Sequence, residues 1–126
     1  KEVAAVHAGW RGLLAGVIPN TLLSFHTPPE EIIAWIGPHI SQTHYPVGES
    51  LRNRFLALNS VNEACFKLIK GNWHLNLALC ATMQLKTLGV SEIYTDARCT
   101  FDNTQNFFSH RRGDSEGRMA AIIWIN

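Results

Sequence analysis

The sequence lacks long apolar runs and clustered charge of either sign. No run approaches the ~20 residues that a membrane helix needs, and the N-terminus has none of the zones of a signal peptide. The 11 lysines and arginines are balanced by 10 acidic residues and do not cluster along the sequence. A dedicated nucleic-acid-binding protein has a basic patch, so this charge pattern argues against that class. We therefore expect a cytoplasmic chain with small-molecule partners, anions among them, and neither nucleic acid nor membrane.

Cysteine and short catalytic signatures are scarce as well. The three cysteines form no CxxC pair, which argues against a secreted disulfide framework and against a thiolate zinc knuckle. The sequence also contains no HExxH, P-loop, GxSxG or GxGxxG motif. A reducing compartment is favoured, and any catalytic chemistry must come from other residues.

Repeats, low-complexity tracts and flexible linkers are absent, so we treat the 126 residues as one unit. Folding a chain of this length buries roughly 65% of its surface, which is enough for a core without disulfides. The chain enters an apolar run at residues 3–7 directly after Lys1-Glu2, with no entry turn. This start predicts a fragment of a longer protein.

Apolar runs and turn signals predict alternating strands and helices. Continuous apolar runs indicate strands, and apolar positions recurring at helical spacing indicate helices. The predicted strands are residues 3–7, 32–36, 66–69, 91–95 and 119–125, with a short edge at 107–109. The predicted helices are residues 13–25, kinked or restarted at Pro19, then 47–58, and 75–88 stopped by Gly89. This alternation predicts a sheet of mixed strand order with helices packed on it.

The first place with candidate chemistry is residues 7–12, HAGWRG. His7 ends a predicted strand, and Gly9 and Gly12 permit positive φ and the close approach of a ligand. His7 and Arg11 are thereby predicted to face one pocket. The alternative is a capped strand whose histidine is satisfied locally.

The second place is residues 109–118, which carry Arg111, Arg112 and Arg118 around a glycine turn. A guanidinium binds phosphate or carboxylate with two parallel hydrogen bonds, so these arginines are candidates for an anion clamp. The alternative is a solvated turn in which Asp114 and Glu116 pair with the arginines.

Three weaker candidates remain. His39 and His44 lie five residues apart in a proline-flanked loop. They are interpreted either as a metal-binding pair or as two solvated histidines. Cys65 and Cys80 lie in apolar surroundings and are interpreted as core thiols. Cys99 follows a strand end and is the best candidate for a reactive thiol, with a structural role as the alternative.

The motifs along the chain resemble those of the YfiH-like family. They are HAGWRG at 7–12, WIGP at 35–38, YPVG at 45–48, CT at 99–100, FFSHRR at 107–112 and GRMA at 117–120. The family is also labelled laccase-domain or multicopper polyphenol oxidoreductase, and peptidoglycan editing factor. The resemblance follows the same order over nearly the whole chain, so residues 1–126 are expected to be the C-terminal portion of a single YfiH-like domain.

The resemblance implies an α+β fold, layered α/β/α with a mixed β-sheet, here as an incomplete domain. It implies a zinc-dependent purine nucleoside enzyme that carries out phosphorolysis of adenosine, inosine and methylthioadenosine, and adenosine deamination. One of its three zinc ligands, and hence a catalytic residue, is His7, and the others are expected upstream in QVH-type and ADC-type segments. Arg11, Arg111 and Arg112 are the candidates to bind phosphate. Because His7 is the lone motif ligand, we expect the isolated chain to bind zinc weakly or not at all.

The sequence departs from the family pattern at three places. Asn76 stands where the family often has aspartate, His110 where it often has tyrosine, and residues 43–44 where it frequently has a cysteine. All three lie outside the zinc motif. They bear on substrate preference more than on reaction class.

Three other functions stay open at this point. An upstream cysteine with His7 as base would make a cysteine hydrolase or amidase that edits peptidoglycan precursors. A copper-dependent polyphenol oxidase is less favoured, because the six histidines include no His-x-His pair. A non-enzymatic binding module is the remaining alternative.

Overall fold

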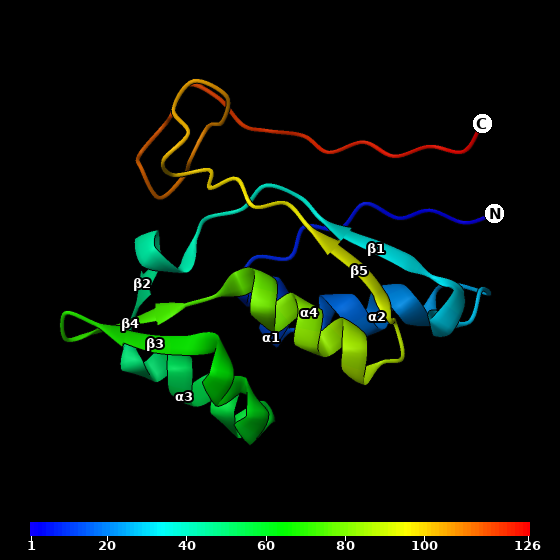
Figure 1. The fold of residues 1–126 in the computed structure, drawn as a ribbon, viewed down its shortest axis with the longest axis horizontal. Helices are drawn as coiled ribbons and strands as arrows, with labels where there is room; N and C mark the ends of the chain where they lie inside the picture. The colour runs from blue at the N-terminus through cyan, green and yellow to red at the C-terminus, as the bar shows by residue number, and fades with distance from the viewer.

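The computed structural model describes residues 1–126 and contains two small sheets. Strands β1 (Ile33–Ile36) and β5 (Glu92–Thr95) pair in parallel and lie side by side in Figure 1. The second sheet is antiparallel in the order β2 (Pro46–Val47), β4 (Asn72–Leu75), β3 (Phe66–Ile69). The predicted combination of parallel and antiparallel strand pairing is confirmed. The parallel pair forms one sheet and the antiparallel strands form the other.

The α-helices are α1 (Trp10–Leu14), α2 (Val17–Leu23), α3 (Glu49–Leu58) and α4 (Leu77–Thr87), and the 3-10 turns are η1 (Pro29–Glu31), η2 (Gln42–His44) and η3 (Ser60–Cys65). In Figure 1, α2 and α4 lie under the parallel sheet and α3 lies under the antiparallel one. Helix α1 packs against the other three α-helices. No helix is long and apolar enough to cross a membrane.

The predicted helix over residues 13–25 is two helices. The break falls at Gly16, which adopts a left-handed φ of 78° between α1 and α2. Pro19 lies in the first turn of α2, where a backbone N–H would have no partner within the helix, so the proline is tolerated there. The new helix start predicted at Pro19 is confirmed, and the helix begins at Val17.

The helix predicted over residues 75–88 starts later than its apolar spacing indicated. Asn76 caps α4 by accepting a hydrogen bond from the Leu79 N–H at 2.9 Å. Lys70 and Gly71, at φ 49° and 82°, turn the chain so that residues 72–75 pair with β3 as strand β4. Gly89, at φ 95°, follows the last turn of α4 as predicted.

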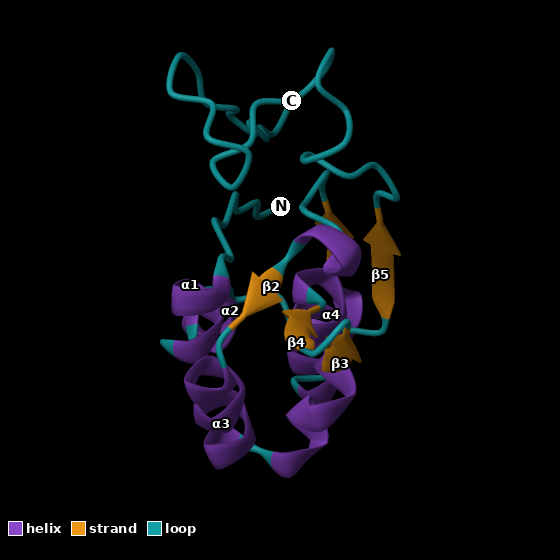
Figure 2. Ribbon diagram, turned by 90° about the vertical axis from the view of Figure 1, so that its left-hand side faces the viewer, coloured by secondary structure: helices purple, strands orange, loops and turns teal.

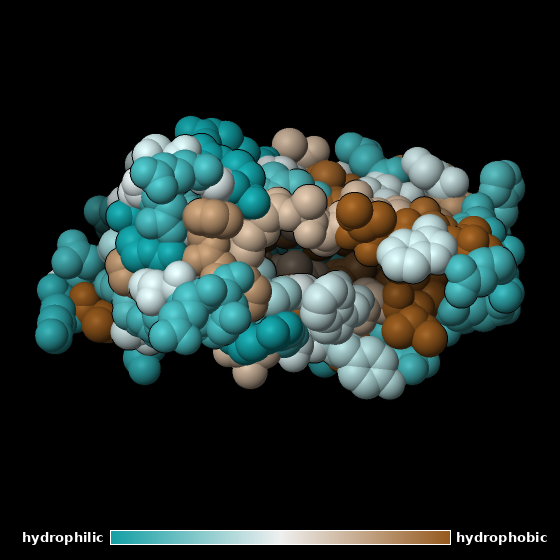
Figure 3. Space-filling model, turned by 90° about the horizontal axis from the view of Figure 1, so that it is seen from above, coloured by the Kyte–Doolittle hydropathy of each residue, from teal (hydrophilic) through white to brown (hydrophobic).

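The strands predicted at residues 3–7, 107–109 and 119–125 are absent. The first and last of these runs make no backbone–backbone hydrogen bond, because neither lies in register with a neighbouring strand. Their apolar side chains are left in solvent, with Ile122 79% and Trp124 69% exposed. Figure 3 shows hydrophobic side chains gathered toward the end of the molecule where both termini run.

The buried core joins the helices to the antiparallel sheet. Leu13 of α1, Phe55 of α3, Leu75 of β4 and Cys80 of α4 are each at most 1% exposed and belong to one cluster. The long loops that follow β5 lie together on one side of this packed part, at the top of Figure 2. Of the two strands of the parallel sheet, β1 reaches this core through Ile36, which packs against it.

Candidate functional site

The carboxyl ends of β1 and β5 place two long loops side by side. Ile36 pairs with Thr95 at the end of the ladder, and the Asp96 N–H donates to the Ile36 carbonyl at 2.8 Å. An isolated parallel bridge between His39 and Cys99 continues this pairing into the loops. In sheets built from parallel strands, ligands bind outside the carboxyl ends of the strands. This edge is the candidate site.

Turn η2 is fixed to the antiparallel sheet beside this edge. The side-chain amide of Gln42 donates to the backbone carbonyls of Cys65 and His74, both at 3.1 Å. In return, Nδ1 of the buried His74 donates to the Gln42 carbonyl at 2.8 Å. These bonds hold the turn that carries His44.

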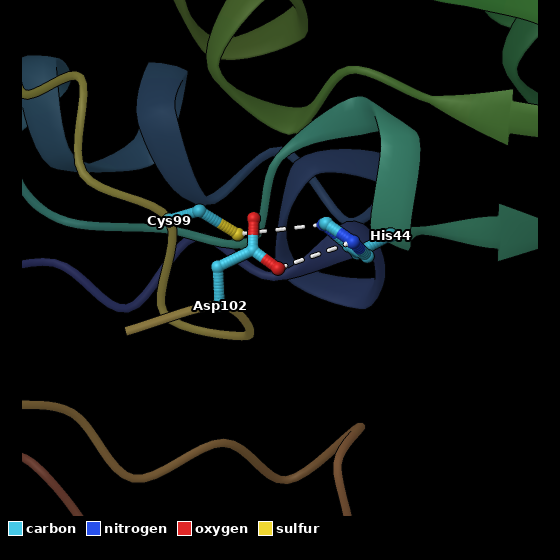
Figure 4. Close-up of side chains that lie close together, drawn as sticks. All are labelled: His44, Cys99 and Asp102. Atoms are coloured by element: carbon cyan, nitrogen blue, oxygen red, sulfur yellow. Dashed lines mark hydrogen bonds and ion pairs between the residues drawn. The ribbon is translucent and has the colours of Figure 1, made fainter. Parts of the chain in front are cut away.

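His44, Cys99 and Asp102 converge at this edge (Figure 4). The Cys99 Sγ lies 3.8 Å from His44 Nδ1, and Asp102 Oδ1 lies 3.2 Å from His44 Nε2. One donor atom from each residue falls within 4.8 Å of the others. Ser41 completes the group, because its hydroxyl lies 3.0 Å from His44 Nδ1 and its N–H donates to Cys99 Sγ at 3.3 Å.

The His44 imidazole is held by stacking and is open to solvent on one side. Its ring lies 4.7 Å from that of Phe101 at an interplanar angle of 13°. The side chain of His44 is 29% exposed and that of Asp102 is 60% exposed. The cluster is therefore accessible through Asp102.

The environment of Cys99 favours its thiolate. Burial raises the pKa of the thiol, but hydrogen bonds from the side chain and N–H of Ser41 and from the N–H groups of Asp102 and Phe101 lower it to about 7. Thiolate, imidazole and carboxylate are the donors that zinc accepts in proteins. These three residues could therefore hold a metal ion.

The structure places His7 in an exposed position beside Gly9. A Cβ on Gly9 would come within 3.3 Å of His7 Nε2, and one on Gly12 would lie 3.2 Å from the His7 carbonyl. The expected positive φ is wrong, since Gly9 has φ −68° and Gly12 is not among the glycines with positive φ. The close approach of His7 and its backbone leaves little room for a larger side chain at these two positions.

Arg111 contacts Tyr45, the residue that follows η2. Its guanidinium lies 4.5 Å from the centre of the Tyr45 ring and donates to the Pro46 carbonyl at 2.8 Å. Burial raises the pKa of Tyr45, while the charge of Arg111 and, least of the causes, that of Arg11 oppose the rise. The Arg11 guanidinium itself lies 4.4 Å from the centre of the Trp10 ring.

The Arg112 guanidinium is fully engaged within its own loop. It donates to the carbonyls of Thr100, Phe101 and Phe107 and pairs with Asp114. The arginine–aspartate pairing is the alternative that the charge pattern left open for this segment. Of the three arginines predicted to bind phosphate, Arg11 and Arg111 remain candidates.

Sequence reasoning weighed His44 and Cys99 separately and did not single out Asp102 or Ser41. His44 and Cys99 are 55 positions apart, and no motif spacing connects them. The one signal that could have joined them is that each follows a predicted strand. Only the parallel pairing of β1 and β5 brings the two loops together.

The chain is similar to curated relatives along nearly its whole length. It is 41% identical to a Haemophilus influenzae protein named purine nucleoside phosphorylase, over 98% of this chain and 52% of the relative. Relatives named purine nucleoside phosphorylase YfiH from Shigella flexneri and Escherichia coli K12 are 41% and 40% identical, over 98% of this chain and 51% of each. The chain spans about half the length of these relatives.

Two crystal structures and one family model agree with these relatives. A Neisseria meningitidis protein of the family DUF152 has a TM-score of 0.80 and 35% identity, over 85% of this chain and 45% of that one. A Bacillus licheniformis hypothetical protein YfiH has a TM-score of 0.77 and 27% identity, over 85% and 43%. The family model described as multi-copper polyphenol oxidoreductase laccase matches residues 1–126. The chain belongs to this family, which includes the proteins named YfiH.

Proposed function

We propose that the protein containing this chain is a purine nucleoside phosphorylase of the cytoplasm, acting on adenosine, inosine and methylthioadenosine. The observation that carries the proposal is the 40–41% identity, over 98% of the chain, with three relatives of that name. The three cysteines are free, in keeping with a reducing compartment.

Two arginines are proposed to supply the positive charge that phosphorolysis needs. A phosphate oxygen forms a bond to the ribose C1′ atom while the bond from C1′ to the purine nitrogen breaks. The electron pair of that bond leaves with the purine, which takes up a proton. The attacking phosphate is a dianion, so Arg11 and Arg111 are assigned to bind it and to offset its charge.

His7 fits the role of a metal ligand. Its imidazole is exposed, and the missing side chain at Gly9 leaves the region around Nε2 open. A zinc ion bound there supplies an activated water, which is the chemistry of adenosine deamination. Within this chain His7 is assigned to hold the ion, together with ligands from upstream segments. Copper is the second candidate, because imidazole also binds it and the family description names it.

The test is phosphate-dependent release of the purine base. The natural protein is expected to convert inosine and phosphate to hypoxanthine and ribose 1-phosphate. Arg111→Ala removes a charge-assisted contact and should raise the KM for phosphate roughly 10- to 150-fold. Arg118→Ala is the matched control, because Arg118 is exposed and donates only to the carbonyls of Asp114 and Gly117.

Two outcomes contradict the proposal. If no base is released from adenosine, inosine or methylthioadenosine when phosphate is present, the activity is not phosphorolysis. If Arg111→Ala and Arg118→Ala have the same KM for phosphate as the natural protein, Arg111 does not bind the anion.

A further inference from the structure

We infer that His44, Cys99 and Asp102 form a zinc(II) site of their own, separate from the ligand set to which His7 belongs. The expectation that these 126 residues bind zinc weakly counted His7 as the lone ligand. The fold groups three donors that the sequence did not connect, and His7 is not one of them.

The donor atoms lie close enough for one ion to draw them together. Zinc–ligand bonds of about 2.0–2.3 Å at tetrahedral angles place neighbouring donors roughly 3.4–3.6 Å apart. One donor atom from each of the three residues lies within 4.8 Å of the others, so movements of about 1 Å close the set around an ion. Cys99 Sγ and Asp102 Oδ1 approach different nitrogens of His44, at 3.8 and 3.2 Å, and only one of these nitrogens would bind the ion.

Contacts with neighbouring residues keep these three side chains close together. Phe101 stacks on the His44 ring, and the bridge between His39 and Cys99 ties the two loops together. Ser41 approaches both His44 Nδ1 and Cys99 Sγ, as the outer partners of metal ligands do. Three protein donors leave one position for water, on the side where Asp102 is exposed.

The Ser41 hydroxyl competes with the Cys99 thiol for one nitrogen of His44. The hydroxyl lies 3.0 Å from His44 Nδ1, and the thiol is hydrogen-bonded to the same atom at 3.8 Å. With Asp102 at the other nitrogen, the three residues also have the order of a cysteine–histidine–carboxylate triad, so zinc binding is the property that separates the two interpretations. When zinc binds, a bond forms from the sulfur to the metal and the thiol proton goes to solvent.

The experiment uses the natural full-length protein carrying His7→Ala, which disables the other ligand set. Cobalt(II) is the spectroscopic probe, and zinc binding is measured by equilibrium dialysis with elemental analysis. The His7→Ala protein is expected to bind cobalt with a thiolate-to-metal charge-transfer band. Adding Cys99→Ser should abolish the band assigned to this site and weaken zinc binding here by ~100-fold or more, beyond the loss seen for outer partners.

The control variants separate this site from other thiols and histidines. Cys80→Ala removes a buried thiol outside the cluster, and His110→Asn changes an exposed histidine that is not one of the three donors. Both are expected to keep the band and the zinc affinity. Asp102→Asn keeps the shape of an exposed side chain, so it tests the site even if Cys99→Ser fails to fold, and it should weaken zinc binding at least 10-fold.

Alkylation provides a second readout. Bound zinc is expected to protect Cys99 from iodoacetamide, measured by peptide mass spectrometry, and Asp102→Asn should reduce this protection. The inference is overturned if Cys99→Ser leaves the band and the zinc affinity unchanged. It is also overturned if zinc gives Cys99 no protection. Neither result bears on phosphorolysis, which is assayed separately.

Discussion

Gln42 and His74 bond to each other in both directions, the Gln42 amide donating to the His74 carbonyl at 3.1 Å and the His74 imidazole donating to the Gln42 carbonyl at 2.8 Å. The Gln42 amide also donates to the Cys65 carbonyl. Turn η2 is thereby attached to strand β4 and to Cys65 at the end of η3. The position of His44 depends on this attachment, although neither Gln42 nor His74 is a candidate ligand.

Gln42→Ala should destabilise the protein by about 1–3 kcal/mol, because it removes two hydrogen bonds to backbone carbonyls, each worth about 0.5–1.5 kcal/mol. The measurement is the free energy of unfolding from a urea titration. Gln105→Ala removes the same side chain from an exposed loop position and should change the free energy by less than about 0.5 kcal/mol. Equal effects of the two substitutions would show that the amide of Gln42 does not hold the turn.

The elements that sequence reasoning predicted well are those set by local pattern. Strands β1, β3 and β5 are short apolar runs between turn residues, and helices α3 and α4 show apolar positions at helical spacing. Strand β4 was missed, because its residues continue the helical spacing of α4 and only the Lys70-Gly71 turn directs them back onto β3. The runs at 3–7 and 119–125 have strand composition, but a strand also needs a neighbour to bond.

The residues of the candidate site also fall into those marked by a local motif and those brought together only by the fold. Arg11 and Arg111 belong to dense local motifs that stand out in the sequence, and their approach to one phosphate stays a prediction. His44, Cys99 and Asp102 belong to separate loops with no shared spacing. Their meeting depends on strand pairing, which a single sequence does not specify.

Arg112→Lys should destabilise the loops that follow β5, although the charge is kept. The guanidinium reaches three carbonyls and Asp114 at once, and a lysine ammonium cannot reproduce this planar arrangement. Carbonyls left without a donor cost about 1–3 kcal/mol. The expected result is a lower melting temperature and faster proteolysis within residues 100–114, with Arg118→Lys as the matched control. Unchanged proteolysis would contradict this structural role.

Glu2 should titrate far below an ordinary glutamate. The backbone N–H of His26, then the hydroxyl of Thr27, the His26 ring and the Thr27 N–H, donate to its carboxylate and lower its pKa from 4.5 to about 2. Because the pKa in the folded state is depressed, the stabilisation is present above pH 4.5 and is lost as the pH falls toward 2. Carboxyl-carbon NMR measures the midpoint directly. A midpoint near 4.5 would mean that the N-terminal segment is not attached to residues 26–27.

His7→Ala and Arg11→Ala should impair the full-length enzyme in different ways, because metal and phosphate serve different steps. Loss of His7 removes a metal ligand, so zinc content, deamination and phosphorolysis should fall together. Loss of Arg11 should leave the metal content unchanged. Its replacement removes a charge-assisted contact worth about 1.5–3 kcal/mol, which lowers phosphorolysis roughly 10- to 150-fold, while deamination, which uses water, falls less.

The measurement is a pair of rates for each variant, one with inosine and phosphate and one with adenosine alone, together with elemental analysis. Zinc at the His44 cluster is counted separately, by repeating the analysis in the Cys99→Ser background. Equal losses of both reactions in Arg11→Ala would mean that Arg11 shapes the pocket through its stacking on Trp10 and does not bind phosphate. Full activity and an unchanged metal content in His7→Ala, with the His44 cluster already removed, would exclude His7 as a ligand.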